Sequence, residues 1–338
     1  LQTQPRCACE MLHADCTERK AEPHRPDHDA MTTETTMPPA TTAEAKDGGG
    51  VVLQRLVSPP CGSIVCGDSL SVMRSWEAES VDLIITSPPY NCRKPYGVCS
   101  DEIAWPEYYA WMEQVIAECY RLLKLGGTLA VNVPGVIRWQ SQHAHAHTWS
   151  DYDPEYPTKR DGVDVKGKGR CEPIGMRIWQ MMFEQDKHMR EPVVWPKGSE
   201  GNAIATSYQM GCDSDPHIRP AHEWILLGSK GRWYHRGGTG RRGPEAMPWL
   251  DETKDVWFMS PVSSDDHPAP FPLELPRRLI RLFGHADDTV ILDPFAGSGT
   301  TCLAAKEMHK QYVGIELNPQ FAAFARETLS QDWMRLEG

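Results

Sequence analysis

An apolar run ends at two consecutive prolines in the stretch Val81-Asp82-Leu83-Ile84-Ile85-Thr86-Ser87-Pro88-Pro89-Tyr90-Asn91. Its aliphatic residues predict a buried β-strand, and proline cannot continue a strand inside a sheet. Each proline fixes its own φ and restricts the residue before it, so we expect a stiff, extended turn. Such a turn, which carries a hydroxyl group, free carbonyls and an aromatic ring, suits the binding of a flat polar ligand. A proline-rich loop without a function is the alternative that this stretch leaves open.

Strands and helices alternate on both sides of this turn. The apolar patterns predict strands at 63–66, 81–86, 128–133, 192–195, 222–227, 289–292 and 311–315, and helices at 106–124, 173–189, 272–283, 300–309 and 319–329. Gly126 and Gly127 are expected to end the first of these helices. The alternation predicts an α/β fold with a mostly parallel, doubly wound sheet.

The first fifty residues differ in composition from the rest of the chain. They are rich in Thr, Ala, Pro, Asp and Glu, contain few large hydrophobic residues and end in three glycines. Such a segment cannot bury enough apolar surface to offset the entropy of ordering, so residues 1–50 are predicted to be a disordered tail. The remaining residues, 51–338, suffice for one large domain. Cys7, Cys9 and Cys16 with His13 in the tail match no common zinc spacing, and no metal site is predicted.

Charge and cysteine content limit the classes of partner. The net charge of −11 argues against a surface that is basic throughout, although a local patch is enough to contact phosphates. Two such patches, at 159–170 and 230–243, are candidates, and solvated loops are the alternative for each. The eleven cysteines form no CxxC pair, which is typical of reduced thiols in the cytoplasm. No apolar run is long enough to cross a membrane, and no secretory signal pattern is present.

A glycine-containing loop follows the strand at 289–292 and precedes a helix, with the sequence Asp293-Pro294-Phe295-Ala296-Gly297-Ser298-Gly299-Thr300-Thr301. Glycines at this place let the backbone approach a ligand closely. No lysine follows them, as a phosphate-binding loop requires, and their spacing is not GxGxxG. Glu316 ends the next strand, where an acid accepts both hydroxyls of a ribose. These features favour S-adenosylmethionine, a nucleoside cofactor held without phosphate contacts, and NAD is the alternative.

With these motifs in place, the chain resembles the DNA amino-methyltransferases over nearly all of residues 60–330. The stretch 86–91 matches their catalytic motif, 293–301 their cofactor loop and Glu316 their ribose-binding acid. The segment 267–272 (His-Pro-Ala-Pro-Phe-Pro) resembles the one that closes over the methionine end of the cofactor. The catalytic motif comes first and the cofactor loop last, which is the circular permutation of the β class.

The resemblance implies a Rossmann-like, seven-stranded sheet with the strand order 3-2-1-4-5-7-6 and strand 7 antiparallel. It implies that Asp68 reaches the adenine of the cofactor. The full set of residues expected to bind S-adenosylmethionine is Asp68, Pro270, Phe271, Asp293, Pro294, Phe295, Ala296, Gly297, Ser298, Gly299, Thr300, Glu316 and Asn318. The expected catalytic residues are Ser87, Pro88, Pro89 and Tyr90.

A mechanism follows for the catalytic motif. The lone pair of an exocyclic amine is delocalised into its base, and hydrogen bonds from the amine to the Ser87 hydroxyl and the Pro88 carbonyl bias the nitrogen towards tetrahedral geometry. Tyr90 is expected to stack on a base flipped out of the duplex. Ser87 at the head of the motif is the family's usual mark of N4-cytosine specificity, so N4-methylcytosine is the expected product. An N6-adenine enzyme and a catalytically silent DNA-binding protein are the alternatives.

The resemblance also concerns partners. The family reads its double-stranded DNA target with a variable insert, which corresponds here to residues 229–262, and the loop at 138–170 is expected to share this task. Arg and Gly residues in the insert fit contacts with phosphates and guanine. Cytoplasmic action on the nucleoid follows from this substrate. The sequence leaves open a homodimer and a cognate restriction endonuclease, as in a restriction-modification system.

Overall fold

The computed structural model describes residues 57–92, 103–138, 171–199, 220–233, 250–260 and 271–331, together with Gly238 and several two-residue strands between these ranges. The chain divides into two compact units, residues 1–52 and 53–338, and all described residues belong to the second. The tail predicted to be disordered therefore lies outside the described residues. No helix in the described part of the chain is long and apolar enough to cross a membrane.

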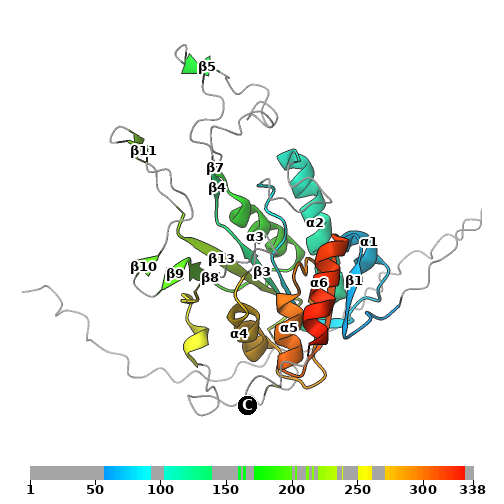
Figure 1. Cartoon of the computed structure of the whole chain (residues 1–338). Coiled ribbons are helices and arrows are strands. Elements are labelled where there is room, and N and C mark those ends of the chain that lie inside the picture. The colour runs from blue at the N-terminus through cyan, green and yellow to red at the C-terminus, as the bar shows by residue number, and fades with distance from the viewer. Residues whose placement is uncertain are drawn as a thin grey trace, which may run out of the picture. The chain divides into compact units, whose positions relative to one another are not determined.

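A seven-stranded sheet forms the centre of the second unit (Figure 1). Its order is β1 (Ser63–Cys66), β15 (Gln311–Glu316), β14 (Val290–Asp293), β2 (Val81–Thr86), β3 (Leu123–Val133), β13 (His222–Ser229) and β8 (Val193–Pro196). Neighbours from β1 to β3 pair in parallel, and β13 is antiparallel to both β3 and β8. The expected order 3-2-1-4-5-7-6, with an antiparallel strand 7 and a permuted chain, is confirmed.

Helices cover both faces of this sheet because successive strand residues point to opposite sides. Ile84 packs into a core with α1 (Ser69–Arg74), α2 (Trp105–Leu122) and α3 (Ile174–Gln185). Its neighbours Leu83 and Ile85 pack into a second core with α4 (Glu274–Phe283) and α5 (Thr300–Glu307). The last helix, α6 (Pro319–Ser330), packs against β1 and α5. A strand that is apolar on both faces is what a doubly wound sheet requires.

One expectation about the first long helix is wrong. We expected Gly126 and Gly127 to end it, but α2 ends at Leu122 and the two glycines lie inside β3. The register of β3 against β2 shifts between Val81 and Leu83. Here a Cβ atom on Gly127 would lie 2.8 Å from the Asp82 carbonyl oxygen. Gly127 is therefore needed for a bulge that brings two strands close together, not for a helix cap.

The remaining elements are short. The loop at 138–170 is bordered by β4 (Ile137–Arg138) and β7 (Cys171–Glu172), which pair, and contains β5 (Lys159–Arg160) and β6 (Val163–Asp164), which also pair. Two further hairpins are made by β9 (Gly198–Ser199) with β10 (Asn202–Ala203) and by β11 (Gly211–Cys212) with β12 (Asp215–Pro216). A 3-10 helix, η3 (Leu250–Thr253), precedes a segment that returns alongside β8.

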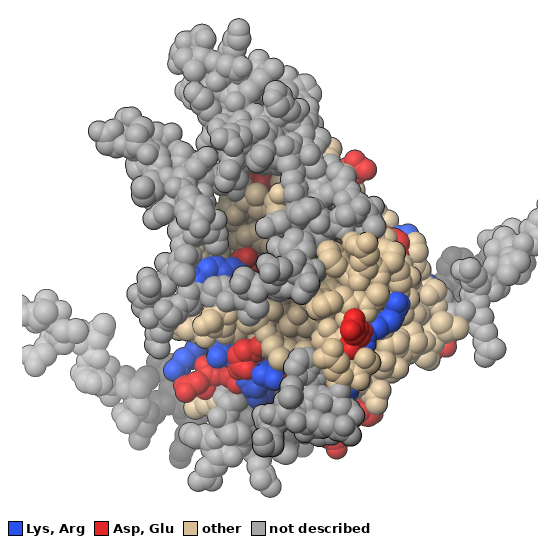
Figure 2. All heavy atoms as spheres, viewed as in Figure 1, with Lys and Arg blue, Asp and Glu red and all other residues tan. Residues whose placement is uncertain are grey.

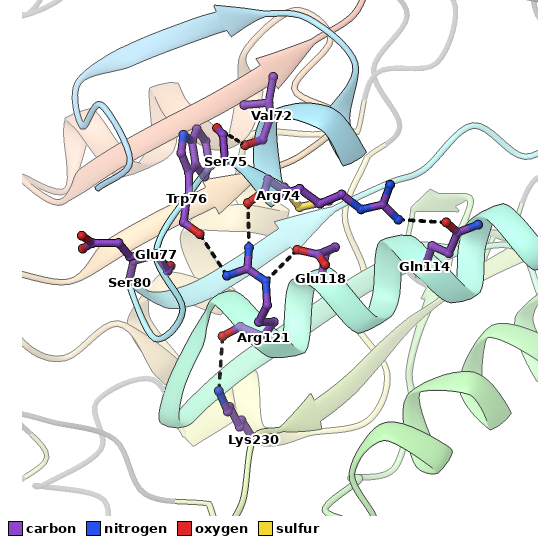
Figure 3. A network of polar contacts seen from close by, with 11 residues as sticks. Val72, Arg74, Ser75, Trp76, Glu77, Ser80, Gln114, Glu118, Arg121 and Lys230 are labelled. Carbon is purple, nitrogen blue, oxygen red and sulfur yellow. Dashed lines mark hydrogen bonds and ion pairs between the residues drawn. The ribbon is translucent and has the colours of Figure 1, made fainter. Parts of the chain in front are cut away.

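Arg121 joins α1, α2 and the end of the sheet that lies away from the strand carboxyl ends (Figure 3). Its guanidinium donates to the carbonyls of Met73 and Trp76, at 2.7 and 2.9 Å, and pairs with Glu118 at 2.8 Å. The backbone carbonyl of Arg121 in turn accepts a hydrogen bond from Lys230. These contacts stabilise the end of the sheet that lies away from the strand carboxyl ends. They take no part at the opposite end, where the parallel strands end.

Candidate active site

The polar side chains of the two motifs meet at the edge of the sheet where the parallel strands end. Thr86 ends β2, Asp293 ends β14 and Glu316 ends β15. The Thr86 hydroxyl donates to Oδ1 of Asp293 over 2.9 Å, which joins positions 207 residues apart. Ligands of open α/β sheets bind at this edge. In the space-filling view, basic and acidic atoms of described residues lie side by side on one face (Figure 2).

Asp293 holds the glycine loop in place through hydrogen bonds to loop residues. It is 1% exposed, and its Oδ2 accepts from the Thr301 hydroxyl at 2.7 Å while Oδ1 accepts from the backbone N–H of Phe295 at 3.0 Å. Burial raises the pKa of this carboxyl from 3.8 to about 6. Because it is enclosed, Asp293 acts on a ligand through the loop that it holds.

The loop itself is shaped by two glycines and by Glu316. Gly297 and Gly299 have φ values of 51° and 87°, which favour glycine. A Cβ atom on Gly299 would lie 3.0 Å from that of Ala325 in α6. Glu316 accepts the backbone N–H groups of Gly297 and Asn318 through its two oxygens, each at 2.8 Å, and burial raises its pKa. A half-buried carboxylate thus occupies the place where a phosphate-binding loop would hold its anion.

Other expected cofactor residues lie around this loop. Asp68 follows β1 at the same edge, and its Oδ1 caps α1 by accepting from the N–H and the hydroxyl of Ser71, at 2.9 and 2.7 Å. The Ser69 hydroxyl donates to the Pro294 carbonyl at 2.5 Å, which ties α1 to the loop. Asn318 caps α6. Phe271 packs against the core under α4, and Pro270 lies outside the described residues.

The Ser-Pro-Pro-Tyr turn is fixed at several points. The Pro89 carbonyl accepts from the Tyr108 hydroxyl of α2 at 2.9 Å. The Tyr90 hydroxyl lies 2.7 Å from the Ser87 hydroxyl and 3.2 Å from the Asn132 carbonyl, to which it donates. The turn therefore holds Ser87 and Tyr90 in contact with each other.

Asn91 closes the motif with a double hydrogen bond. Its amide donates to the carbonyl of Ile103 at 2.9 Å and accepts from the N–H of Ile103 at 2.8 Å. Asn91 is buried and has a φ of 57°, a conformation that asparagine adopts more readily than most residues. This Asn91–Ile103 clamp holds together the two ends of the segment between residues 91 and 103.

Three polar residues that the sequence did not place in the site extend it across the sheet. Asn132 of β3 donates through Nδ2 to the Tyr90 hydroxyl at 3.1 Å and to Glu223 of β13 at 2.7 Å. Glu223 pairs with Lys197 at 2.9 Å. Asn132 is a polar residue within the otherwise apolar run 129–133 of β3, and this pattern was the indication that the sequence offered. Among the described residues, no group of three or more His, Cys, Asp or Glu side chains is suited to a metal ion.

Lys230 is the first residue of the expected basic patch at 230–243, and its ammonium lies within the sheet. Its ammonium donates to the carbonyls of Leu123 and Arg121, at 2.8 and 3.3 Å, and pairs with Glu79 at 3.3 Å. It follows the end of β13, whose Ser229 pairs with Thr128 near the start of β3. Lys230 is therefore bonded to the backbone at the edge of the sheet opposite the site.

Comparison with known proteins gives the family. The family model N6_N4_Mtase, described as DNA methylase, matches residues 81–327. The type II methyltransferase M.XycI of Xanthomonas campestris pv. cyanopsidis is 29% identical over 78% of this chain and 86% of its own length. M.SmaI of Serratia marcescens, also a type II methyltransferase, is 27% identical over 79% of this chain and 90% of its own length.

Solved structures of DNA methyltransferases are also similar to this chain. TTHA0409 of Thermus thermophilus, a putative DNA modification methylase determined with S-adenosyl-L-methionine, is 26% identical with a TM-score of 0.55 over 79% of this chain and 94% of its own. The cytosine-N4-specific PvuII DNA methyltransferase shares the fold, with a TM-score of 0.57 and 21% identity over 81% of this chain and 88% of its own. The match over residues 81–327 shows that this chain belongs to the N6/N4 DNA methylase family.

Proposed function

We propose that this protein transfers the methyl group of S-adenosylmethionine to the exocyclic N4 amine of a cytosine flipped out of duplex DNA. The observation that carries the proposal is the hydrogen bond between Thr86 and Asp293, which places Ser87 next to the glycine loop. The family match over residues 81–327 supports the broader assignment of the chain as a DNA methylase of the N6/N4 family.

The residues of the loop fit S-adenosylmethionine. Glu316 lies at the end of β15 and is half-buried, and an ionised carboxylate there has lone pairs left for two ribose hydroxyls. The same carboxylate already accepts the N–H of Gly297, a group that a phosphate-binding loop would present to its anion. We assign the ribose to Glu316, the adenine to the side of Asp68, and the rest of the cofactor to the loop 293–300 with Pro270, Phe271 and Asn318. When bound, S-adenosylmethionine supplies an electrophilic methyl group.

Ser87 and Pro88 are proposed to accept the two hydrogens of the target amine. The Pro89 carbonyl is already taken by Tyr108, whereas no described residue donates to the Pro88 carbonyl. The proline turn sets this acceptor in place before the substrate arrives, so little reorganisation is needed in the reaction. Drawing both hydrogens to acceptors pulls the amine towards tetrahedral geometry and frees its lone pair for attack.

Tyr90 is proposed to stack on the flipped base. Reaching a base inside a duplex requires such extrusion, and an aromatic ring lowers its cost by replacing the lost stacking. The hydrogen bonds of the Tyr90 hydroxyl to Asn132 fix the position of the ring.

Ser87 favours cytosine as the target, and adenine N6 is the alternative because the same two acceptors serve an adenine amine. Reading of the DNA sequence is assigned to the insert 229–262 with the loop 138–170. The segment between β8 and β13 is a further candidate, since Pro196 and His222 pair at the edge of the sheet that holds the site.

The test is to incubate the protein with labelled S-adenosylmethionine and unmethylated genomic DNA, and then to identify the labelled nucleoside after digestion. Label in N4-methylcytosine, lost with Ser87→Ala, is the expected result. Label in N6-methyladenine overturns the choice of cytosine but keeps the site. No label in any nucleoside, while the cofactor is bound, overturns the proposed activity.

A further inference from the structure

A chain of polar contacts crosses four neighbouring strands at the edge of the sheet that holds the site. It runs from Lys197, which follows β8, through Glu223 of β13 and Asn132 of β3 to Tyr90 and Ser87, which follow β2. The successive distances are 2.9, 2.7, 3.1 and 2.7 Å. The side chains of Lys197 and Glu223 are only 15% and 16% exposed, so this ion pair is largely shielded from water.

The direction of the hydrogen bonds along this chain is set by Glu223. An ionised carboxylate only accepts hydrogen bonds, so Asn132 must turn Nδ2, not Oδ1, towards it. One Nδ2 hydrogen then goes to Glu223 and the other to the Tyr90 hydroxyl. Oδ1 of Asn132 is buried and accepts no hydrogen bond from the described residues. A buried acceptor without a partner is unfavourable, which indicates that Glu223 imposes this orientation on the amide.

The orientation of Asn132 determines that of the two hydroxyls. The Tyr90 oxygen accepts from Asn132 Nδ2, and its single hydrogen goes to the Asn132 carbonyl. With the Tyr90 hydrogen directed to the Asn132 carbonyl, Ser87 is the donor in the 2.7 Å contact, in which either hydroxyl could donate. With its hydrogen used in this way, the Ser87 oxygen has its lone pairs free to accept from an amine.

Lys197 pairs with the negative charge of Glu223, on which this arrangement of hydrogen bonds depends. Its ammonium is 2.9 Å from Glu223 and lies 3.2 Å from the centroid of the Trp195 ring. Burial lowers the pKa of Lys197, and the charge of Glu223 opposes that shift. The ammonium in turn attracts the Glu223 carboxylate and helps to hold it in place. A protonated Glu223 could donate a hydrogen bond as well as accept one. Asn132 would then no longer have to point Nδ2 towards it.

We propose that the Lys197–Glu223 ion pair orients Asn132 and, through Tyr90, turns the Ser87 hydroxyl so that its lone pairs face the target amine. Lys197, Glu223 and Asn132 are positioning residues in this scheme. They do not remove the proton of the amine, because the Asn132 amide separates the carboxylate from the hydroxyls and does not relay protons. The inference rests on the proposed function.

The first variant is Glu223→Gln, which keeps the shape of the side chain but lets it donate as well as accept. We expect kcat for methyl transfer to fall by roughly 30- to 100-fold, as for other losses of preorganisation, with the Kd for S-adenosylmethionine within about twofold of wild type. Glu307→Gln is the matched control, because Glu307 pairs with Arg277 between α5 and α4, outside this chain of contacts. It should leave kcat unchanged.

The second variant tests the charge. Lys197→Met should lower kcat, because Glu223 then lacks the ammonium that holds its carboxylate against Asn132. Lys197→Arg keeps the positive charge and should keep most of the rate. A Glu223→Gln enzyme or a Lys197→Met enzyme with the kcat of wild type overturns the inference. A wild-type enzyme that methylates no DNA overturns instead the proposed function.

Discussion

The Thr86 hydroxyl donates to the buried carboxylate of Asp293, so that the end of β2 and the end of β14 are joined by a side-chain hydrogen bond. Oδ1 accepts from Phe295 as well, and the bond therefore couples the proline turn to the backbone of the glycine loop. Two motifs far apart in the chain thus share one rigid support.

Thr86→Val removes this donor with little change in shape. Hydrogen bonds to charged groups contribute about 1.5–3 kcal/mol, so we expect the free energy of unfolding in urea to fall by about that amount. Ser330→Ala, which removes an exposed bond to Glu327 at the end of α6, should change it by less than about 0.5 kcal/mol. Equal effects of the two substitutions would contradict the role given to Thr86.

Asp293 makes the stability depend on pH. Its pKa is 3.8 without the protein environment and about 6 in the fold, so between these values the native state binds more protons than the unfolded state. Stability is therefore lost as the pH rises through this window, by about 3 kcal/mol for a shift of this size. The fall should be smaller in Asp293→Asn, which retains the contribution of Glu316, whose pKa burial also raises. Unfolding free energies of both proteins from pH 4 to pH 7 test this, and parallel curves would refute it.

Tyr108 supports the catalytic turn from α2. Its hydroxyl is bonded to the Pro89 carbonyl, so Tyr108→Phe leaves that carbonyl without its partner and free to shift. We expect kcat to fall by about tenfold, by the usual sensitivity of rates to small displacements, while S-adenosylmethionine binds as before. Tyr312→Phe, on β15, serves as the control and should retain the wild-type kcat. Retention of full kcat by Tyr108→Phe would show that the turn needs no such support.

Lys230 allows a test of the basic patch. Because its ammonium bonds to the carbonyls of Arg121 and Leu123, Lys230→Met should destabilise the fold yet leave the salt dependence of DNA binding unaltered. A lysine that contacts phosphate would reduce the slope of log K against log salt by about one. Binding measured over a range of salt concentrations distinguishes the two, and a reduced slope would restore Lys230 to the DNA-binding surface.

The sheet order was predictable because the two motifs and their order in the chain identify the permuted fold. Single elements were predictable where an apolar run was long, as at 81–86. The bulge at Gly126 and Gly127 was not, because the need for glycine there comes from Asp82 on a neighbouring strand. Lys197 and Glu223 were missed as site residues for the same reason: their roles depend on pairing between strands that no local pattern reveals.

The Asn91–Ile103 clamp separates the catalytic turn from changes in the chain beyond it. Since the two ends of the intervening segment are held at one point, residues can be inserted or deleted between them without displacing Ser87. Closing a longer loop costs only slowly increasing entropy. The sequence between Asn91 and Ile103 can therefore change in evolution while the catalytic turn, and with it the reaction, stays the same.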